Sequence, residues 1–432
     1  MNIRYISIGV MGLAVLASVL LRPEIPSGNF DKLDEKKNHF MVKMPKYQAI
    51  ATRSLPDDQK KQANEQIQNF FLELEKQSRF SKTLAYDKFL ILNFIGADTS
   101  FPSFEGELQT QLETLYIKKT PLSPDAALFS LTAGDLARLK QYDIMSDLKK
   151  KEELYEKLEQ DAVVYVLSLY AILGFLFILI VLSPFLITFF LKNPGTPIFA
   201  DALRNAGEPG ISLLESSVLY LFLLFSIGTV ASKFIPSAYI LYFQLLLIPA
   251  ILAGTVFYYY RNTLSLESVK VLFYSQKLSL EDFLKEAVWG ILGYAALFPM
   301  ALLAIMLMAG SGLVDSGPVR FAHPIIFVIE ENFFIVFLLA VVFVPFAEEV
   351  VFRSMMYGFF RQRLRILYSA FLTGGIFAIL HPQGFIAFPA LALLGSGLAI
   401  LREFRKSIIA PTVTHMMVNA TSLIGAYFVL KG

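Results

Sequence analysis

Long apolar stretches alternate with short polar connections over most of the chain. Nine stretches have the composition of membrane helices, at about residues 5–21, 163–191, 213–232, 236–260, 287–309, 333–360, 366–381, 385–401 and 407–430. A helix needs about 20 mainly apolar residues to cross the hydrocarbon core of a bilayer, so the stretch at 366–381 is marginal. The pattern predicts an all-α, polytopic membrane helix bundle of about nine transmembrane helices.

One long segment, residues 22–160, breaks this pattern because it is polar and mixed in charge. Ser54 ahead of Pro56 is a signal for the start of a helix. The apolar residues that follow are spaced to line one helix face: Ile67, Phe70, Phe71 and Leu74. The run Phe89–Leu92 is buried, but periodicity does not decide between strand and helix. The segment predicts a small, mainly helical extramembrane domain that serves for binding or as a spacer.

Lysines and arginines in the short connections predict the orientation of the bundle. With the N-terminus inside, thirteen of them fall on the inner side and three on the outer side. Because positive residues are retained in the cytoplasm, we expect a multi-pass integral membrane protein with residues 22–160 outside. Residues 1–21 are an anchor or a signal peptide, and the lack of a clear Ala-x-Ala site before Arg22 favours an uncleaved anchor.

Composition narrows the chemistry that the chain can perform. Hydrophobic residues make up 55% of the chain and charged residues 17%, which is typical of a protein in lipid. A net charge of +2 without a basic stripe argues against nucleic acid as a partner. Because there is no cysteine, any chemistry must come from Ser, His, Asp, Glu or a metal that they hold. We divide the chain into the first helix (1–21), the polar domain (22–160), a first set of membrane helices (161–284) and a C-terminal membrane core (285–432).

The C-terminal core contains charged residues where an apolar helix is predicted. Glu348, Glu349 and Arg353 continue the apolar run that begins at Phe333. A charge at membrane depth costs about 3 kcal/mol on insertion scales, so each requires a partner or a function. Glu349 and Arg353 are four residues apart and meet on one helix face, whereas Glu348 is turned about 100° away. We expect Glu349 to be paired and Glu348 to face a cavity as a general base.

Two later apolar stretches add further polar side chains at the same spacing. Phe377 and His381 share one face, and Pro382 disfavours helical geometry at His381. His415 and Asn419 share a face of the last stretch. A carboxylate, an imidazole and a His–Asn pair are the parts needed to add water to an amide and to hold the resulting oxyanion.

These three motifs, in this order on late membrane helices, closely resemble the CAAX protease and bacteriocin-processing family of intramembrane endopeptidases. The resemblance covers about residues 285–430 and does not reach residues 1–160. It implies hydrolysis of a peptide bond of a membrane-associated peptide or protein. By match to the family's motifs, Glu348 with His381 would activate water, and His415 with Asn419 would form the oxyanion hole. Glu349, Arg353 and Phe377 would support the site.

Several alternatives stay open at this stage. Glu348, His381 and His415 form a possible zinc site, although we favour a site without a cofactor because Asn419 beside His415 suits an oxyanion hole. Intramembrane ionisable residues also build transport paths, so a transporter or a non-catalytic scaffold is the alternative function. The resemblance leaves the substrate undetermined, since eukaryotic relatives act on prenylated CaaX proteins, whereas many relatives are bacterial and act on unknown peptides or in bacteriocin immunity. By the same resemblance we expect the protein to lie in a bacterial cytoplasmic membrane.

Overall fold

The structure is a computed structural model that describes residues 3–20, 40–75, 82–97, 102, 106–192, 197–207, 210–276, 279–311, 329, 332–381 and 383–431. These residues are helical or lie in turns and loops, and their one β-bridge joins Tyr274 to Ser407. The chain divides into two compact units. The bundle unit comprises residues 1–30 and 176–428, and the polar unit comprises residues 31–175 and 429–432.

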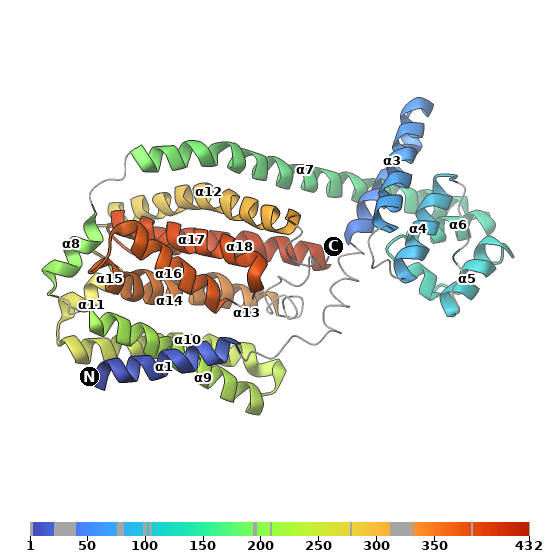
Figure 1. The fold of residues 1–432 in the computed structure, drawn as a ribbon. Coiled ribbons are helices and arrows are strands. Elements are labelled where there is room, and N and C mark those ends of the chain that lie inside the picture. The colour runs from blue at the N-terminus through green and yellow to red at the C-terminus, as the bar shows by residue number, and fades with distance from the viewer. Residues whose placement is uncertain are drawn as a thin grey trace. The chain divides into compact units, whose positions relative to one another are not determined.

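The bundle unit is built from long helices and short connecting ones (Figure 1). Its helices before the C-terminal core are α1 (Ile3–Leu20), α8 (Ile198–Asn205), α9 (Ile211–Phe234), α10 (Ser237–Thr263) and α11 (Leu266–Phe273). The C-terminal core consists of α12 (Leu280–Gly310), α13 (Phe333–Phe337), η4 (Leu338–Phe343), α14 (Val344–Glu348), η5 (Glu349–Met356), α15 (Tyr357–Arg361), α16 (Ile366–Leu380), α17 (Gly384–Phe404) and α18 (Ile409–Lys431). The two units share α7 (Leu148–Lys192), whose apolar half belongs largely to the bundle.

All nine predicted apolar stretches fold as helices, so the all-α membrane bundle is confirmed. Among the described residues, six helices are long and apolar enough to cross a membrane, within α7, α9, α10, α12, the continuous segment α13–α15, and α17. Shorter apolar helices cover Arg4–Val19 and Ile366–Leu380. The number nine itself stays a prediction. Helix is the expected secondary structure in lipid, because each backbone N–H and C=O there must find a hydrogen-bond partner within the protein.

Small residues allow the core helices of the bundle to approach closely. Gly374 of α16 faces Gly395 of α17, and a Cβ atom at Gly395 would lie 2.9 Å from the Cα atom of Gly374. A Cβ atom at Gly293 of α12 would lie 2.6 Å from the hydroxyl of Thr414 on α18. That hydroxyl donates a hydrogen bond of 2.7 Å to the carbonyl of Gly290. These contacts bring α16 close to α17 and α18 close to α12, which is how membrane helices pack where the hydrophobic effect is weak.

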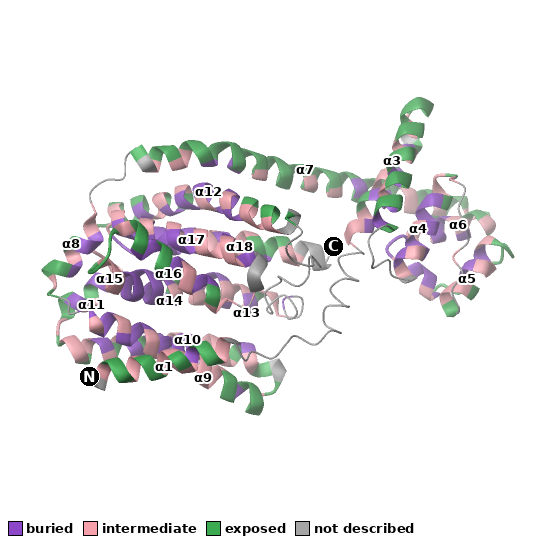
Figure 2. Ribbon diagram, viewed as in Figure 1, coloured by how far each residue is buried: buried purple, intermediate pink, exposed green. Residues whose placement is uncertain are grey.

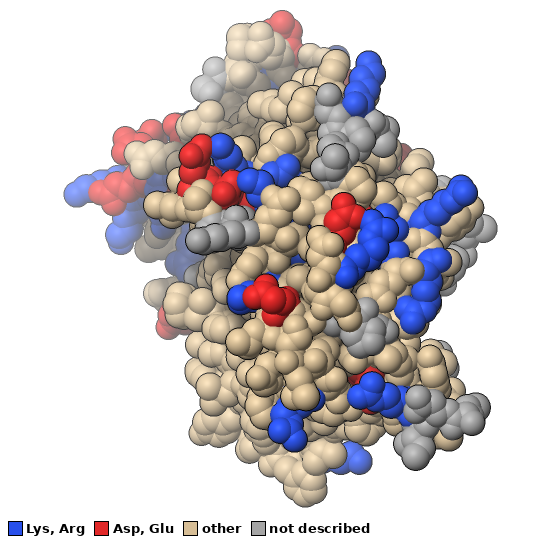
Figure 3. Space-filling view, turned by 90° about the vertical axis from the view of Figure 1, so that its left-hand side faces the viewer, with Lys and Arg blue, Asp and Glu red and all other residues tan. Residues whose placement is uncertain are grey.

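One end of the bundle is held together by a network of ion pairs. Glu403, at the end of α17, accepts hydrogen bonds from Tyr357 and from Arg361 of α15. Arg402 is fully buried and donates to the carbonyl of Val271 in α11. The pairs Arg405–Glu286 and Lys406–Asp282 join the α17–α18 connection to the start of α12. We call this end the network end, and Figure 3 shows basic side chains gathered on the side of the molecule that carries α8, α11 and α15 in Figure 1.

The polar unit has a hydrophobic core of its own (Figure 2). Besides a helix over residues 40–51 it contains α3 (Asp57–Glu75), α4 (Lys82–Phe94), α5 (Glu107–Tyr116), α6 (Gly134–Ile144) and the short turns η1 (Thr52–Ser54) and η2 (Ala127–Ser130). Ile67, Phe71 and Leu74 of α3 are buried and Phe70 packs beside them, as their spacing predicted. The run Phe89–Leu92 is part of α4, so it is helix and not strand.

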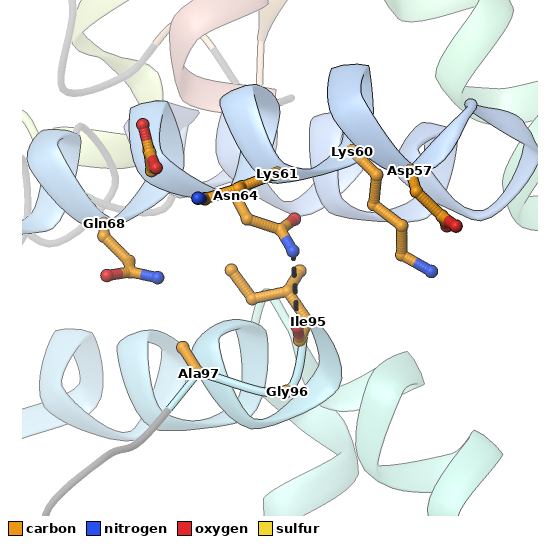
Figure 4. A pocket seen from close by; sticks show the side chains of 9 residues that line it. Asp57, Lys60, Lys61, Asn64, Gln68, Ile95, Gly96 and Ala97 are labelled. Carbon is orange, nitrogen blue, oxygen red and sulfur yellow. Dashed lines mark hydrogen bonds between the residues drawn. The ribbon is translucent and has the colours of Figure 1, made fainter.

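A shallow pocket of about 450 Å³ lies between α3 and the end of α4 (Figure 4). The amide of Asn64 crosses it and donates a hydrogen bond of 3.4 Å to the carbonyl of Ile95. Both acidic and basic side chains line it, among them Asp57, Lys60 and Lys61. We assign no ligand to this pocket, because a solvated rim of mixed charge carries no specific chemistry.

Candidate active site

The first motif lies on a helical segment whose backbone departs from α geometry. Residues 338–343 and 349–356 are π-helical, and single π turns are frequently found at functional sites. In the first of these segments the N–H of Val344 bonds to the carbonyl of Leu339, five residues back. Pro345 follows and has no N–H to offer. The carbonyl of Ala340 therefore has neither of its two usual helical donors.

That carbonyl is used by the last helix. The side-chain amide of Asn419 on α18 donates a hydrogen bond of 2.8 Å to the oxygen of Ala340. This bond fixes one N–H of the amide and leaves Asn419 on the wall of the cavity described below. Nothing in the local sequence around Asn419 predicts the contact, since it depends on the backbone of a helix 79 residues away.

Glu349 and Arg353 form a pair that is closed off from solvent. The Nε atom of Arg353 lies 3.2 Å from a carboxylate oxygen of Glu349, and neither side chain has exposed surface. The pair is the one that the i, i+4 spacing predicted. The guanidinium group also lies over the ring of Phe377, 4.4 Å from its centroid. Its nitrogen atoms make no hydrogen bond within the described part of the chain, so charge and the aromatic face hold it in place.

His415 joins the two carboxylates of the first motif. Its Nδ1 atom lies 2.8 Å from the second carboxylate oxygen of Glu349, and its Nε2 atom lies 3.6 Å from Glu348. Because a carboxylate only accepts, Nδ1 carries the proton of that short hydrogen bond. The imidazole ring is 2% exposed and packs edge-on against Phe377. Glu348 is the open member of the group, with 19% of its side chain accessible.

Glu348 and His415 lie on the wall of a cavity of about 1,090 Å³ inside the bundle unit. Of the residues expected in the site, the cavity is lined by Glu348, His381, His415, Asn419 and Phe377. Glu349 and Arg353 are not among its lining residues and lie behind its wall. The two adjacent glutamates therefore occupy different environments, one facing a cavity and one inside a buried ion pair.

His381 reaches the cavity from the end of α16. The helix ends at Leu380, and His381 has an extended backbone (φ −81°, ψ 142°), as the sequence Leu380-His381-Pro382 predicted. The Nδ1 atom of His381 lies 2.7 Å from the carbonyl oxygen of Phe377, which makes Nδ1 the donor. The ring stacks at a tilt on Phe377, with 4.2 Å between the centroids. Phe377 thus contacts both histidines and the arginine.

The cavity also contains residues that sequence reasoning missed. Tyr220 of α9 and Gln383, two residues after His381, line it together with Ala17 and Ser18 of α1. The side-chain oxygen of Gln383 is buried and has no hydrogen-bond partner within the described part of the chain. Its position directly after the His-Pro pair was a signal that could have been used. Tyr220 offered none, because a tyrosine in an apolar helix is ordinary.

The three residues considered for zinc do not share a centre in this arrangement. Within the ranges described above, no three His, Asp or Glu side chains come together in the geometry of a metal site. Glu348 and His415 are close, but Nδ1 of His415 is engaged by Glu349 and Nδ1 of His381 by a backbone carbonyl. The metal-free site stays a prediction.

Comparison with known proteins places the motifs in a family. Residues 330–421 match the family model described as type II CAAX prenyl endopeptidase Rce1-like. The match contains all three motifs and is narrower than the resemblance expected over residues 285–430. No curated protein and no solved structure matches the chain. Over residues 330–421 the chain is therefore similar to the Rce1-like type II CAAX prenyl endopeptidases, which supports the resemblance drawn from the three motifs.

Proposed function

We propose that this protein is an intramembrane endopeptidase that hydrolyses a peptide bond with water activated by Glu348 and His381. The observation that carries the proposal is the separation of two adjacent glutamates. Glu348 is open to a cavity that also holds two histidines and an asparagine, whereas Glu349 is neutralised behind its wall. A base needs access to water, and a structural carboxylate needs a partner, so this arrangement suits one of each.

In the first step Glu348 removes a proton from water while the oxygen of that water attacks the carbonyl carbon of the peptide. His381 orients the water. Because the Nδ1–H group of His381 donates a hydrogen bond to the carbonyl of Phe377, the Nε2 atom of the neutral ring is a hydrogen-bond acceptor. Glu348 then returns the proton to the amide nitrogen as the C–N bond breaks, which yields a carboxylate and a free amine.

The oxyanion of the tetrahedral intermediate is held by His415 and Asn419. Asn419 uses its second amide N–H, since the first is bonded to Ala340. His415 donates from Nε2 only when both ring nitrogens carry protons, because Nδ1 already donates to Glu349. With Glu348 and Glu349 negative and Arg353 and His415 positive, the four buried charges sum to zero, which limits the cost of burying them.

A peptide cleavage assay on a variant of Glu348 tests the proposal. Purified protein in liposomes would be tested on labelled peptides with and without a prenylated C-terminus. Glu348→Gln retains the size of the side chain and removes the base, so we expect cleavage to fall by about 100-fold or more. Thr229→Ala, which lies on the same cavity wall away from the proposed machinery, is the matched control.

The variant Glu348→Gln tests the identity of the base, and the unchanged protein tests whether the chain is an enzyme or a scaffold. A variant that folds and cleaves as the unchanged protein does would refute the assignment of the base. Absence of cleavage of every peptide by the unchanged protein would favour a transporter or scaffold. Elemental analysis of the same preparation covers the metal. Stoichiometric zinc whose removal abolishes cleavage, and whose return restores it, would replace the metal-free mechanism.

A further inference from the structure

Different helix ends and connections lie at the two ends of the bundle. At the network end lie the start of α1, the start of α9 and the end of α10, because Arg4 pairs with Glu215 and donates to Asn262. The start of α12, the end of α17 and the start of α18 lie there too, joined by Arg405–Glu286 and by a backbone bond from Ile408 to Phe273. The opposite end therefore holds the end of α1, the turn between α9 and α10, and the connection between α16 and α17.

The cavity extends from mid-bundle to this opposite end and not to the network end. At this end the lining includes residues at the ends of four helices: Ser18 of α1, Ser232 of α9, His381 after α16 and Gln383 before α17. On α10 the lining residues Gln244, Leu247 and Ile248 belong to the half that starts at Ser237. Glu348 and His415 are among the lining residues farthest from this end, so they form the floor.

The two ends also differ in charge. Arginines and lysines crowd the described helix ends and connections at the network end: Arg4, Arg204, Arg261, Lys270, Lys285, Arg361, Arg363, Arg365, Arg402, Arg405 and Lys406. At the other end the described part of the bundle unit has Lys233 at the end of α9. By the rule that positive residues stay in the cytoplasm, the network end is cytoplasmic. The mouth of the cavity is then on the extracytoplasmic side.

We propose that the reaction site is reached from the extracytoplasmic side of the membrane, and that it takes an uncharged, apolar peptide segment of a membrane-associated or exported protein. That the occupant is a peptide rests on the proposed function, whereas the side of entry rests on the geometry of the cavity. Among the lining residues that the structure describes, Glu348 is the only Asp, Glu, Lys or Arg, so few charges there would pair with a charged segment. Hydroxyl and amide groups near the mouth supply hydrogen bonds to a backbone: Ser18, Ser232, Gln383 and Ser422.

Single cysteines in this cysteine-free chain test the side of entry in intact cells. Ser232→Cys at the mouth and Ser422→Cys on α18 are exposed, conservative positions that line the cavity. Asn205→Cys at the end of α8 is the matched exposed control at the network end. We expect a membrane-impermeant maleimide to label Ser232→Cys and Ser422→Cys without permeabilisation, and Asn205→Cys after permeabilisation alone. The reverse pattern, or two cavity positions that are never labelled, would overturn the proposal.

A second readout joins access to cleavage. In liposomes with the extracytoplasmic face outward, a bulky thiol reagent on Ser422→Cys should reduce peptide cleavage at least tenfold, while the same reagent on Asn205→Cys should leave the rate unchanged. Full cleavage by the labelled Ser422→Cys protein would show that substrate takes another route. If the unchanged protein cleaves nothing, the proposed function fails, but the labelling pattern in cells still decides the side of entry.

Discussion

The close contact between α16 and α17 allows one methyl group to be placed where its effect is predictable. In Gly374→Ala the new Cβ atom would lie 2.5 Å from the carbonyl oxygen of Ala392 and 2.7 Å from the backbone nitrogen of Ser396. The first distance is about 0.9 Å shorter than the 3.4 Å at which ordinary contact begins. Both obstacles are backbone atoms of α17, so a side-chain rotation does not relieve the clash and the helices must separate.

The neighbouring glycine is the matched control, because a Cβ atom at Gly375 would meet nothing within 4 Å. Overpacking costs about 1–3 kcal/mol, so Gly374→Ala should lower the melting temperature in detergent while Gly375→Ala should not. Phe377 and His381 follow on the same helix and would shift with it. A displacement of about 1 Å at a reacting group costs about 100-fold in rate, which sets the expected loss of peptide cleavage.

The two alanine variants differ in no respect except the direction in which the methyl group points. Melting curves and cleavage rates would be measured on both in the same lipid. If Gly374→Ala melts and cleaves as Gly375→Ala does, α16 and α17 do not approach as closely as described. A loss of cleavage with an unchanged melting temperature would mean that the helices separate at little cost but carry His381 out of place.

Two further predictions concern buried charge. Glu349→Gln removes the carboxylate that pairs with the buried Arg353, and Arg353→Met leaves the buried Glu349 with His415 as its remaining partner. Breaking a fully buried pair costs about 3–5 kcal/mol, so both variants should melt below Glu348→Gln, whose side chain faces the cavity. Equal melting temperatures for all three variants would contradict the pairing. In the polar unit, burial raises the pKa of Asp87 from its ordinary 3.8 to about 7, against the lowering effect of a hydrogen bond from the N–H of Ala133. Since the folded form binds the proton more tightly, stability should fall as pH rises from about 4 to about 7 and level off above that. This is measured by the protection of the α4 amides against hydrogen exchange, relative to their intrinsic rates, in the full-length protein at pH 5 and pH 8. Asp87→Asn should remove the difference in protection between the two pH values. The same pH dependence of protection in Asp87→Asn would assign it to another group.

Much of the architecture was already determined by the sequence. The nine apolar stretches predicted where helices lie, because a backbone in lipid satisfies its hydrogen bonds most simply within one helix. The pairing of Glu349 with Arg353 followed from their spacing, since residues four apart on a helix lie on one face. The end of α16 before His381 followed from Pro382. Each of these is a local property, decided by residues within one or two turns of each other.

The relations between helices were decided by the tertiary structure alone. Sequence reasoning paired Glu348 with His381, but it did not foresee that His415 lies between Glu348 and Glu349, or that Asn419 is held by the carbonyl of Ala340. These contacts depend on the rotation and depth of α18 against the helix that carries the glutamates. Close contacts through small residues set that rotation, and spacing along the chain carries no information about it. For the same reason the end of the bundle to which the cavity extends became visible only once the helices were packed.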